Sequence, residues 1–421
     1  MSLSERILFL GGTRRGLEKA DELDLSVTFI QEPARFVPET LLLCDELHMM
    51  EISDHALVEE LAALLHRHDP FQAVASFGEA GMLPAALVAR RLGLYQNPPE
   101  VVALTNDKAA LRRRLAEAGF PPVAFRHCRD QRDARLFAAE NGLPIILKPT
   151  DSSGSLGVTL VARDADIPPA FAAAARYSSD GSALAEDYLE GPEVSVEALT
   201  LDGVHHLLTV TDKETTGPPH FVETGHTVPS RLPRPVQAEL LDTARRLLEA
   251  VGHRFGSSHT ELRWTAAGPR VVETHARPGG DQIPLLVELA LGVDMEGTCL
   301  RRLLGRAAVV EPPGGPAAEG AHGAAAVRFF RHRPGRVLRI EGADEARRMP
   351  GVARVEARVE VGMDVPEMTD TWTRLGFVVA VGSTPEEAAR RAEASRDAIG
   401  LTVSPPRPAG APAAKSVDEH G

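Results

Sequence analysis

The sequence V-V-E-T-H-A-R-P-G-G-D at residues 271–281 combines a strand pattern with a row of reactive side chains. Glu273, His275 and Arg277 lie two residues apart, and side chains at that spacing share one face of a β-strand. We therefore expect a carboxylate, an imidazole and a guanidinium to point into one cavity. Gly279 and Gly280 follow, where the lack of a side chain lets the backbone approach a ligand closely.

A second carboxylate precedes this stretch by twelve residues. Glu261 lies in S-S-H-T-E-L-R-W at 257–264, and A-A-G-P at 266–269 predicts a turn between the two segments. A hairpin would place Glu261 opposite Glu273 or His275. Two carboxylates so close repel unless a hard cation lies between them, and Mg²⁺ prefers such oxygen ligands beside nucleotide phosphates. The alternative is an exposed hairpin with ordinary surface charges.

Composition restricts the class of protein. A chain of 421 residues predicts two or three domains. An apolar fraction of 43% is typical of a globular protein, and no apolar run approaches the ~20 residues of a membrane span. The N-terminus is expected to form a strand and not a signal leader. A net charge of −13 disfavours binding to nucleic acid or to an anionic membrane.

The cysteines favour a reducing compartment. Cys44, Cys128 and Cys299 are odd in number and far apart in the sequence, which argues against a disulfide framework and against a cysteine zinc site. We therefore expect a soluble cytoplasmic enzyme.

The N-terminal segment predicts a βαβ unit. A strand at 6–10, a glycine-containing turn G-G-T-R-R-G at 11–16 and a second strand at 26–30 open the chain. Glu32 follows these glycines at about the distance of a ribose-binding acid, but their spacing differs from G-x-G-x-x-G. An NAD-dependent dehydrogenase therefore remains one alternative. Residues 105–119 next predict a helix that carries Lys108 in its first turn; alone, a solvated lysine is its ordinary interpretation.

Residues 143–161 predict a β-hairpin with a phosphate-facing loop. A buried strand ends at Lys148, small residues follow, and a second strand returns. Such a loop lets backbone N–H groups face an anion, although it is not a Walker A sequence. The loop residues with this potential are Ser152, Ser153, Gly154, Ser155 and Gly157.

Residues 183–199, A-L-A-E-D-Y-L-E-G-P-E-V-S-V-E-A-L, predict two strands joined by a hinge. The first strand carries Glu186. The hinge Asp187, Tyr188 and Leu189 offers main-chain groups to an adenine edge. Glu193 opens the next strand, where a carboxylate suits a ribose diol.

The order of these motifs, from Lys108 to E-T-H-A-R-P-G-G, resembles the ATP-grasp superfamily over roughly residues 5 to 400. The resemblance implies that Lys108 and Lys148 hold the phosphates of ATP and that residues 152–157 close over them. It further implies that Glu186 and the hinge hold adenine, Glu193 binds ribose, and Glu261 and Glu273 ligate Mg²⁺ or Mn²⁺. One departure is His275, because the family usually has asparagine there; we expect it to contact the metal or the terminal phosphate.

Within the superfamily, the chain looks most like the bacterial L-amino-acid ligases. F-V-E-T-G-H-T-V-P-S at 221–230 is similar to a loop that those enzymes place over the amino-acid site, with Glu223 and His226 as the matching residues. Residues 323–389 resemble their carboxylase-like end lobe, and residues 385–399 predict an amphipathic helix. Residues 311–320 are expected to form a linker and residues 405–421 a disordered tail.

We therefore expect a mixed α/β (α+β) protein of the ATP-grasp type. The predicted parts are an N-terminal Rossmann-like domain at 1–104, a two-lobed ATP-grasp domain at 105–310 with its lid at about 120–190, and a C-terminal α+β lobe at 321–404.

The predicted activity is ATP-dependent ligation of a carboxylate, in particular an amino acid, to an amine through an acyl phosphate, with release of ADP and phosphate. Lys148 and Arg277 would stabilise charge, and Glu223 and His226 would act on the substrates. Gly279, Gly280 and Asp281 would line the substrate site, with Asp281 paired either to Arg277 or to a substrate ammonium. The expected partners are small molecules only, and a homodimer is compatible with the sequence.

Two rival functions remain at this stage besides the dehydrogenase. One is carboxylation of an amine through carboxyphosphate. The other is an ATP-binding module without catalysis, which would not need both carboxylates.

Overall fold

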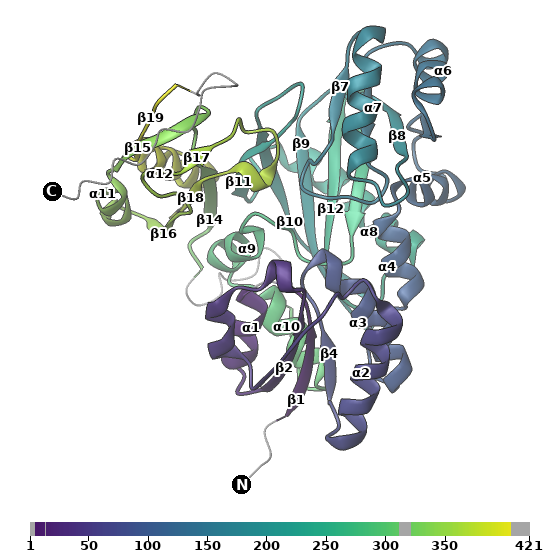
Figure 1. Cartoon of the computed structure of the whole chain (residues 1–421), viewed down its shortest axis with the longest axis vertical. Helices are drawn as coiled ribbons and strands as arrows, with labels where there is room; N and C mark the ends of the chain where they lie inside the picture. Colours follow the sequence, from purple (N-terminus) through teal and green to yellow (C-terminus); the bar gives the residue numbers. More distant parts are fainter. Residues whose placement is uncertain (1–4, 13, 311–320, 406–421) are drawn as a thin grey trace, which may run out of the picture.

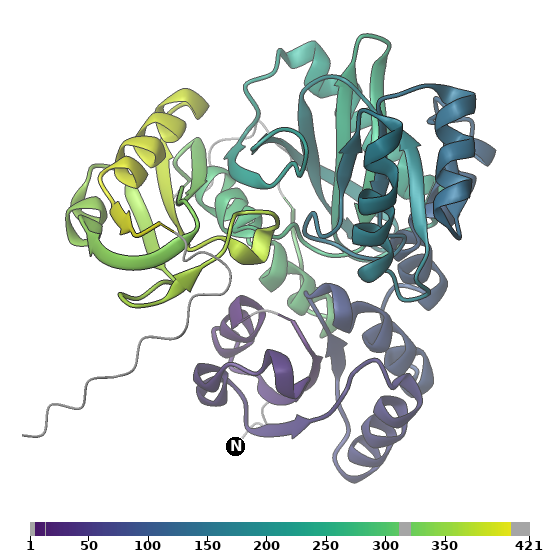
Figure 2. The ribbon, with the colours of Figure 1, turned by 45° about the horizontal axis from the view of Figure 1, so that its top comes forward.

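The computed structural model describes residues 5–12, 14–310 and 321–405. The linker expected at 311–320 and residues 406–421 of the expected tail lie outside them. Figure 1 and Figure 2 show three groups of elements, an N-terminal lobe, a lid lobe and a C-terminal lobe, arranged around a large central sheet. Among the described helices, none is long and apolar enough to cross a membrane.

The N-terminal lobe is a parallel sheet covered on both faces. Its order is β3-β2-β1-β4, and all its pairings are parallel. The strands are β1 (Arg6–Leu10), β2 (Ser26–Gln31), β3 (Glu46–Met49) and β4 (Ala73–Ala75). α1 (Arg14–Asp21) packs on one face, and α2 (His55–His68) and α3 (Glu79–Leu92) pack on the other. The 3₁₀ turns η1 (Pro33–Arg35) and η2 (Pro38–Leu43) connect β2 to β3.

The helix predicted at 105–119 begins at Lys108, three residues later than expected. α4 (Pro99–Asn106) precedes α5 (Lys108–Glu117), and Asp107 separates them. The Asp107 carboxylate accepts a hydrogen bond from the Ala110 amide at 2.8 Å, so aspartate and not threonine caps α5. Lys108 is therefore the first residue of its helix. Its backbone amide donates to the Thr150 carbonyl, just before residues 152–157, which we call the lid loop.

The lid lobe is a small antiparallel sheet with two helices. Its order is β5-β8-β6-β7, and β6 and β7 form the predicted hairpin. The strands are β5 (Phe125–Cys128), β6 (Ile145–Lys148), β7 (Thr159–Val161) and β8 (Ala183–Asp187). α6 (Gln131–Asn141), the turn η3 (Asp164–Asp166) and α7 (Ile167–Arg176) complete the lobe. Apolar residues of both helices pack against the sheet in one core.

The central sheet has eight strands in the order β13-β12-β9-β10-β11-β14-β18-β16. The first five strands along the chain are β9 (Glu193–Leu201), β10 (Val204–Thr215), β11 (Glu223–Val228), β12 (Gly256–Thr265) and β13 (Gly268–His275). α8 (Arg234–Val251) covers one face through Leu240 and Leu247. The other face, toward the lid lobe, carries the charged residues described below.

The C-terminal lobe continues this sheet. β14 (Ala324–Phe329) pairs with β11 over Gly225–Val228, so no sheet boundary exists where we expected a separate lobe to begin. β16 (Val352–Ala357) and β18 (Gly376–Gly382) complete the sheet, and α12 (Pro385–Asp397) packs on β14 and β18. The remaining elements are β15 (Gly335–Glu341), α11 (Ala343–Arg348), β17 (Asp364–Val365), η4 (Thr371–Thr373) and β19 (Gly400–Val403).

α9 (Ile283–Leu291) and α10 (Met295–Leu303) join the parts. Leu286 packs with Val327 of β14, and Leu300 packs with Phe9 of β1. In both views these helices lie between the N-terminal lobe and the C-terminal lobe. Their burial fixes the position of residues 276–282, which connect β13 to α9.

Candidate active site

The two predicted metal carboxylates lie side by side on neighbouring strands. Glu261 of β12 is the register partner of Glu273 of β13. Each has its own ammonium: Lys213 Nζ lies 2.6 Å from Glu261 Oε1, and Lys108 Nζ lies 3.2 Å from Glu273 Oε2. Burial alone would raise the pKa of both carboxyls, but these cations outweigh it and hold each pKa below its usual value. Both side chains are therefore ionised at neutral pH.

Lys213 is a central residue that the sequence analysis did not identify. Its side chain is 2% exposed and also lies 2.9 Å from Glu193 Oε1 and 3.5 Å from Glu223 Oε1. Burial would lower the pKa of this ammonium, but the surrounding carboxylates raise it well above the usual value. Lys213 lies within β10, in the polar sequence T-D-K-E-T. The alternation of side chains along a strand does not show which face is buried there, so the sequence does not distinguish Lys213 from a surface lysine.

Lys148 is held by a buried ion pair in the lid lobe. Its Nζ lies 2.6 Å from Glu186 Oε2, and Arg112 Nε donates to Glu186 Oε1 at 2.6 Å. Burial is the main reason that the pKa of Lys148 lies below its usual value, while Glu186 acts against it. Burial would raise the pKa of Glu186, yet Arg112 and Lys148 lower it to about 2. Arg112 is a second residue that the sequence analysis missed.

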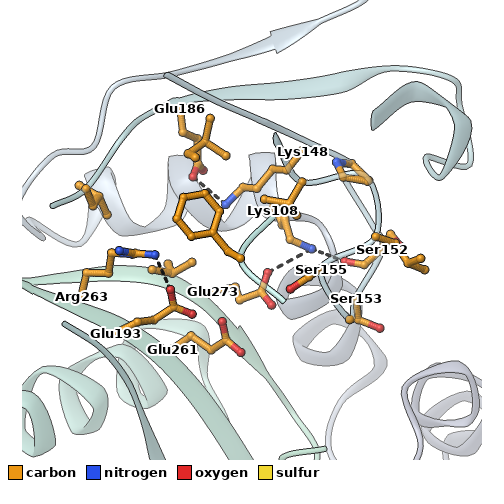
Figure 3. A pocket seen from close by; sticks show the side chains of 18 of the residues that line it. Lys108, Lys148, Ser152, Ser153, Ser155, Glu186, Glu193, Glu261, Arg263 and Glu273 are labelled. Carbon is orange, nitrogen blue, oxygen red and sulfur yellow. Dashed lines mark hydrogen bonds and ion pairs between the residues drawn. The ribbon is translucent and has the colours of Figure 1, made fainter. Parts of the chain in front are cut away.

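These groups line a pocket between the lid lobe and the central sheet, which we call the lid pocket (Figure 3). All predicted nucleotide-binding residues except Gly157 line it: Lys108, Lys148, Ser152, Ser153, Gly154, Ser155, Glu186, Asp187, Tyr188, Leu189 and Glu193. Figure 3 shows Lys108 and Lys148 directed toward the same space as Glu261 and Glu273.

Gly157 has a packing role in the structure. Its φ is +67°, and a Cβ atom there would lie 2.7 Å from the Ala173 carbonyl oxygen of α7. The absence of a side chain at Gly157 therefore allows the lid loop to pack closely against α7 of the lid lobe. Lys108 reinforces the same loop by donating to the Ser152 carbonyl at 2.5 Å.

Arg263 forms the wall of the pocket near the hinge, and the sequence analysis did not identify it. Its Nη2 donates to Glu193 Oε2 at 2.5 Å. The guanidinium carbon also lies 5.7 Å from the ring centroid of Tyr188 and 5.5 Å from that of Phe221. Glu193 is thus held between Arg263 and Lys213, with its carboxylate at the pocket surface.

A second and larger cavity, with a volume of ≈ 650 Å³, adjoins the lid pocket. We call it the inner chamber. Glu223, Glu261 and Glu273 line both cavities, so the carboxylate pair forms part of their common boundary. All predicted substrate residues line the chamber: Glu223, His226, Arg277, Gly279, Gly280 and Asp281.

Glu223 and His226 lie on strand β11, and not on a loop as we had expected. Strand pairing to β10 and β14 buries both side chains. His226 Nε2 lies 3.3 Å from Asp281 Oδ2, while its buried Nδ1 has no partner among the described residues. Burial raises the pKa of Glu223, and Lys213 only partly offsets this effect because other carboxylates surround it.

His275 lies behind Glu273. Its Nε2 is 3.0 Å from Glu273 Oε1, and its Nδ1 is 2.9 Å from Glu79 Oε2. Among the described residues, no group of three or more histidine, cysteine, aspartate or glutamate side chains is arranged to hold a metal. The His275 imidazole faces Glu273 and Glu79, and its contact with a metal or with the terminal phosphate stays a prediction.

Arg277 pairs with an acid that the sequence analysis missed. Its Nε donates to Glu79 at the start of α3, and its Nη1 donates to the Pro278 carbonyl at 2.8 Å. The expected partner Asp281 instead receives both terminal nitrogens of Arg374, one of them at 2.7 Å. Arg374 lies 93 residues further along the chain, which explains why no local sequence pattern could reveal this pair.

The glycines after Arg277 differ in their surroundings. A Cβ atom at Gly279 would lie 2.8 Å from His259 Nδ1, whereas nothing lies within 4 Å of one at Gly280. His259 itself bridges buried Glu197 and Glu261, at 3.0 Å and 3.1 Å. Gly279 thus allows the chain to pass close to the histidine that positions Glu261.

Two ionised carboxylates at the boundary of two cavities fit a divalent cation whose other ligands come from phosphate oxygens and water. Glu261 and Glu273 supply too few oxygens for a closed site of their own, in keeping with the absence of a preformed cluster among the described residues. Lys108 and Lys148 add positive charge on the side of the lid loop, so the pocket as a whole suits a polyphosphate.

Comparison with known proteins gives a consistent result. Three family models match: an ATP-grasp N-terminal domain at 17–95, an ATP-grasp domain at 141–284, and an L-amino acid ligase C-terminal domain 2 at 328–404. None of the three describes a nicotinamide-dependent enzyme, and neither the dehydrogenase nor the carboxylase alternative is favoured.

The chain is 31% identical over 368 residues to the uncharacterized protein y4rH of Sinorhizobium fredii, covering 83% of this chain and 72% of that protein. It is 25% identical over 246 residues to the alanine–anticapsin ligase of Bacillus subtilis, covering 53% of this chain and 52% of the ligase. The chain thus spans about half the length of that ligase.

A solved L-amino acid ligase from Bacillus licheniformis has the same fold, with a TM-score of 0.79 at 19% identity over 96% of this chain and 100% of that one. The motif order, the paired carboxylates between two cavities and these matches agree: the chain belongs to the ATP-grasp superfamily of ATP-dependent carboxylate–amine ligases.

Proposed function

We propose that this protein joins the carboxylate of an amino acid to an amine through an acyl phosphate, with ATP bound in the lid pocket and both organic substrates in the inner chamber. The observation that carries the proposal is the common boundary of the two cavities, which is formed in part by Glu223, Glu261 and Glu273. A phosphoryl group can move from one cavity to the other only across such a boundary.

ATP would lie with its phosphates toward Lys108 and Lys148 and its base at the hinge Asp187–Leu189. Residues 152–155 would cover the phosphates, and Glu193 would receive the ribose hydroxyls. A divalent cation, Mg²⁺ or Mn²⁺, held by Glu261 and Glu273 would neutralise phosphate charge. His275, which lies against Glu273 at 3.0 Å, would orient that carboxylate and not bind the metal itself.

In the first step, a carboxylate oxygen of the amino acid attacks the γ-phosphorus, and the bond from that phosphorus to the bridging oxygen of ADP breaks. The lysines neutralise the transferred charge. In the second step, the amine nitrogen attacks the acyl carbon, the bond from carbon to the phosphate oxygen breaks, and phosphate leaves. The amide product retains one oxygen of the original carboxylate.

The chamber offers groups for the second step. Arg277 uses two of its five donors on Glu79 and Pro278 among the described residues, so further donors can stabilise the tetrahedral oxyanion. Glu223 and the Nδ1 of His226, unpartnered among the described residues, can accept the proton that the substrate ammonium loses to become the attacking amine. The raised pKa of Glu223 brings that carboxyl closer to the range useful for a base.

The test is a matrix of amino-acid pairs with ATP and Mg²⁺, read first as ADP release and then as product mass. The proposal predicts ADP release that requires both an acid and an amine, and a product lighter by one water than their sum. ADP release that depends on bicarbonate would instead indicate carboxylation. ADP release without any acid would contradict acyl activation.

A further inference from the structure

The turn η4 of the C-terminal lobe contacts the lid loop. Thr371 Oγ1 donates to the Gly154 carbonyl at 3.3 Å, and the Thr371 amide approaches the same oxygen at 3.5 Å. The contact is close, because a Cβ atom at Gly154 would lie 2.8 Å from Thr371 Oγ1. The phosphate-facing loop therefore rests on a segment that is 217 residues away in the sequence.

The residue that follows η4 contacts the inner chamber. Arg374 is 8% exposed and binds Asp281 with both terminal nitrogens. Its Nη1 also donates to the Glu223 carbonyl at 3.3 Å, and its guanidinium carbon lies 3.7 Å from the Phe329 ring centroid. Charge pairing, a bidentate geometry and the aromatic contact together fix this side chain.

The chamber backbone at this contact has an unusual conformation. Asp281 and Gln282 have φ values of +55° and +68°, in the left-handed region that favours glycine. Such a conformation persists only where neighbouring contacts hold it. Arg374 supplies that contact through the Asp281 carboxylate, whose pKa burial would raise but Arg374 and His226 lower. Gln282 immediately precedes α9, so the same ion pair sets where that helix begins.

The two contacts belong to one rigid turn. The Asp370 carboxylate accepts from the amides of Trp372 and Thr373 at 2.9 Å and 3.0 Å. Arg374 Nε donates back to the Thr371 carbonyl at 2.9 Å. Because the turn is closed on itself, a shift of Thr371 with the lid loop moves Arg374 as well.

We propose that Thr371 and Arg374 are positioning residues that couple closure of the lid loop over ATP to formation of the amino-acid chamber. The inference rests on the proposed binding of ATP in the lid pocket. In this arrangement, the bound phosphates attract the lid loop, and the loop in turn fixes the position of η4. Arg374 then holds Asp281 in the conformation that shapes the chamber. The acyl phosphate would thus form only when the inner chamber that binds the organic substrates is complete.

Hydrogen exchange of the full chain, with and without AMP-PNP and Mg²⁺, tests the coupling without knowledge of the substrate. We expect the nucleotide analogue to slow exchange in the wild type both at residues 150–160 and at residues 279–291, by at least about fivefold. In Thr371→Val and Arg374→Gln, protection at 150–160 should persist, while protection at 279–291 should be lost. Arg347→Gln, a surface arginine of α11 that pairs with Asp344, should behave as the wild type.

The outcomes separate the two proposals. No protection anywhere in the wild type would contradict ATP binding in the lid pocket. If the nucleotide analogue protects only the lid loop in the wild type, the coupling is overturned and the proposed function stays intact. The same holds if protection at 279–291 survives in both variants. If Arg374→Gln does not fold, Thr371→Val decides, because it removes one hydroxyl contact and leaves the ion pair in place.

Discussion

Charged residues inside the site occur in matched groups. Lys213 lies among Glu193, Glu223 and Glu261, and Lys108 pairs with Glu273. A buried carboxylate without such a partner would lose its charge, because burial alone raises its pKa. The lysines therefore keep Glu261 and Glu273 ionised, which is the form that binds a divalent cation.

Glu273→Gln tests this pairing. The amide keeps the shape of the side chain but removes a proposed metal ligand and leaves Lys108 without its partner. We expect turnover to fall by at least about 100-fold, which corresponds to ~2.7 kcal/mol of transition-state stabilisation, with little change in Tm. The measurement is steady-state ADP release, and Glu117→Gln, at a site 69% exposed, is the control. More than about a tenth of wild-type turnover would contradict a metal role for Glu273.

A buried histidine makes stability depend on pH. His253 is 3% exposed, its Nδ1 lies 3.2 Å from Asn97 Nδ2, and burial lowers its pKa from 6.5 to about 4. Because the folded pKa lies below the unfolded one, the unfolded chain binds more protons as pH falls. The stability contributed by neutral His253 is therefore complete above pH 6.5 and is lost as pH falls toward 4.

We expect this residue to make the protein about 2 kcal/mol less stable at pH 5 than at pH 7. Urea unfolding of the wild type and of His253→Gln at both pH values measures the difference. The variant should lack this part of the pH dependence, whatever its absolute stability. An identical pH dependence in both proteins would show that His253 does not titrate across the transition.

At the scale of elements, the sequence predicted strands and loops well where neighbouring residues determine them. The hairpin β6–β7 follows from local alternation and turn residues. The sequence left Glu261 opposite Glu273 or His275, and a register shift between Glu261 and Leu262 makes Glu273 its partner. The start of α5 differed because Asp107 caps the helix by accepting from the Ala110 amide. Glu223 and His226 were placed on a loop, since their strand β11 is stabilised by pairing to distant β14.

The lid lobe offers a matched pair of glycines. Gly157 and Gly181 have φ values of +67° and +72°, but only Gly157 is crowded, by the Ala173 carbonyl. Gly157→Ala should therefore displace the loop and weaken ATP binding by about tenfold or more, that is ~1.4 kcal/mol. Gly181→Ala should cost only the ~1 kcal/mol of a strained backbone and leave ATP affinity unchanged. Titration with AMP-PNP measures both; equal affinities would contradict the packing role of Gly157.

For the whole molecule, the active site depends on contacts between all parts of the chain. Glu79 of the N-terminal lobe holds Arg277, Lys148 comes from the lid lobe, and Arg374 of the C-terminal lobe holds Asp281. The motif order predicted the superfamily, and every nucleotide-binding residue that it named except Gly157 lines the lid pocket. It could not predict Glu79, Lys213 or Arg374, because each acts through a partner brought near only by the fold.

The continuous sheet explains why these contributions are fixed. Gly225–Val228 of β11 pair with Ala325–Arg328 of β14, so the strand that carries Glu223 and His226 is also held by the C-terminal lobe. Glu223 and His226, which are proposed to act on the amine, therefore lie on the same sheet as the proposed metal carboxylates Glu261 and Glu273. This arrangement lets phosphoryl transfer and amide formation occur at neighbouring positions.

The central claim is that the acid is activated as an acyl phosphate, and the fate of the carboxylate oxygen tests it most directly. An accepted amino acid labelled with ¹⁸O in its carboxylate is turned over with ATP and an amine, and the phosphorus products are observed by ³¹P NMR. We expect ADP without label and inorganic phosphate that carries one ¹⁸O per turnover. Label in AMP, with release of pyrophosphate, would contradict this claim.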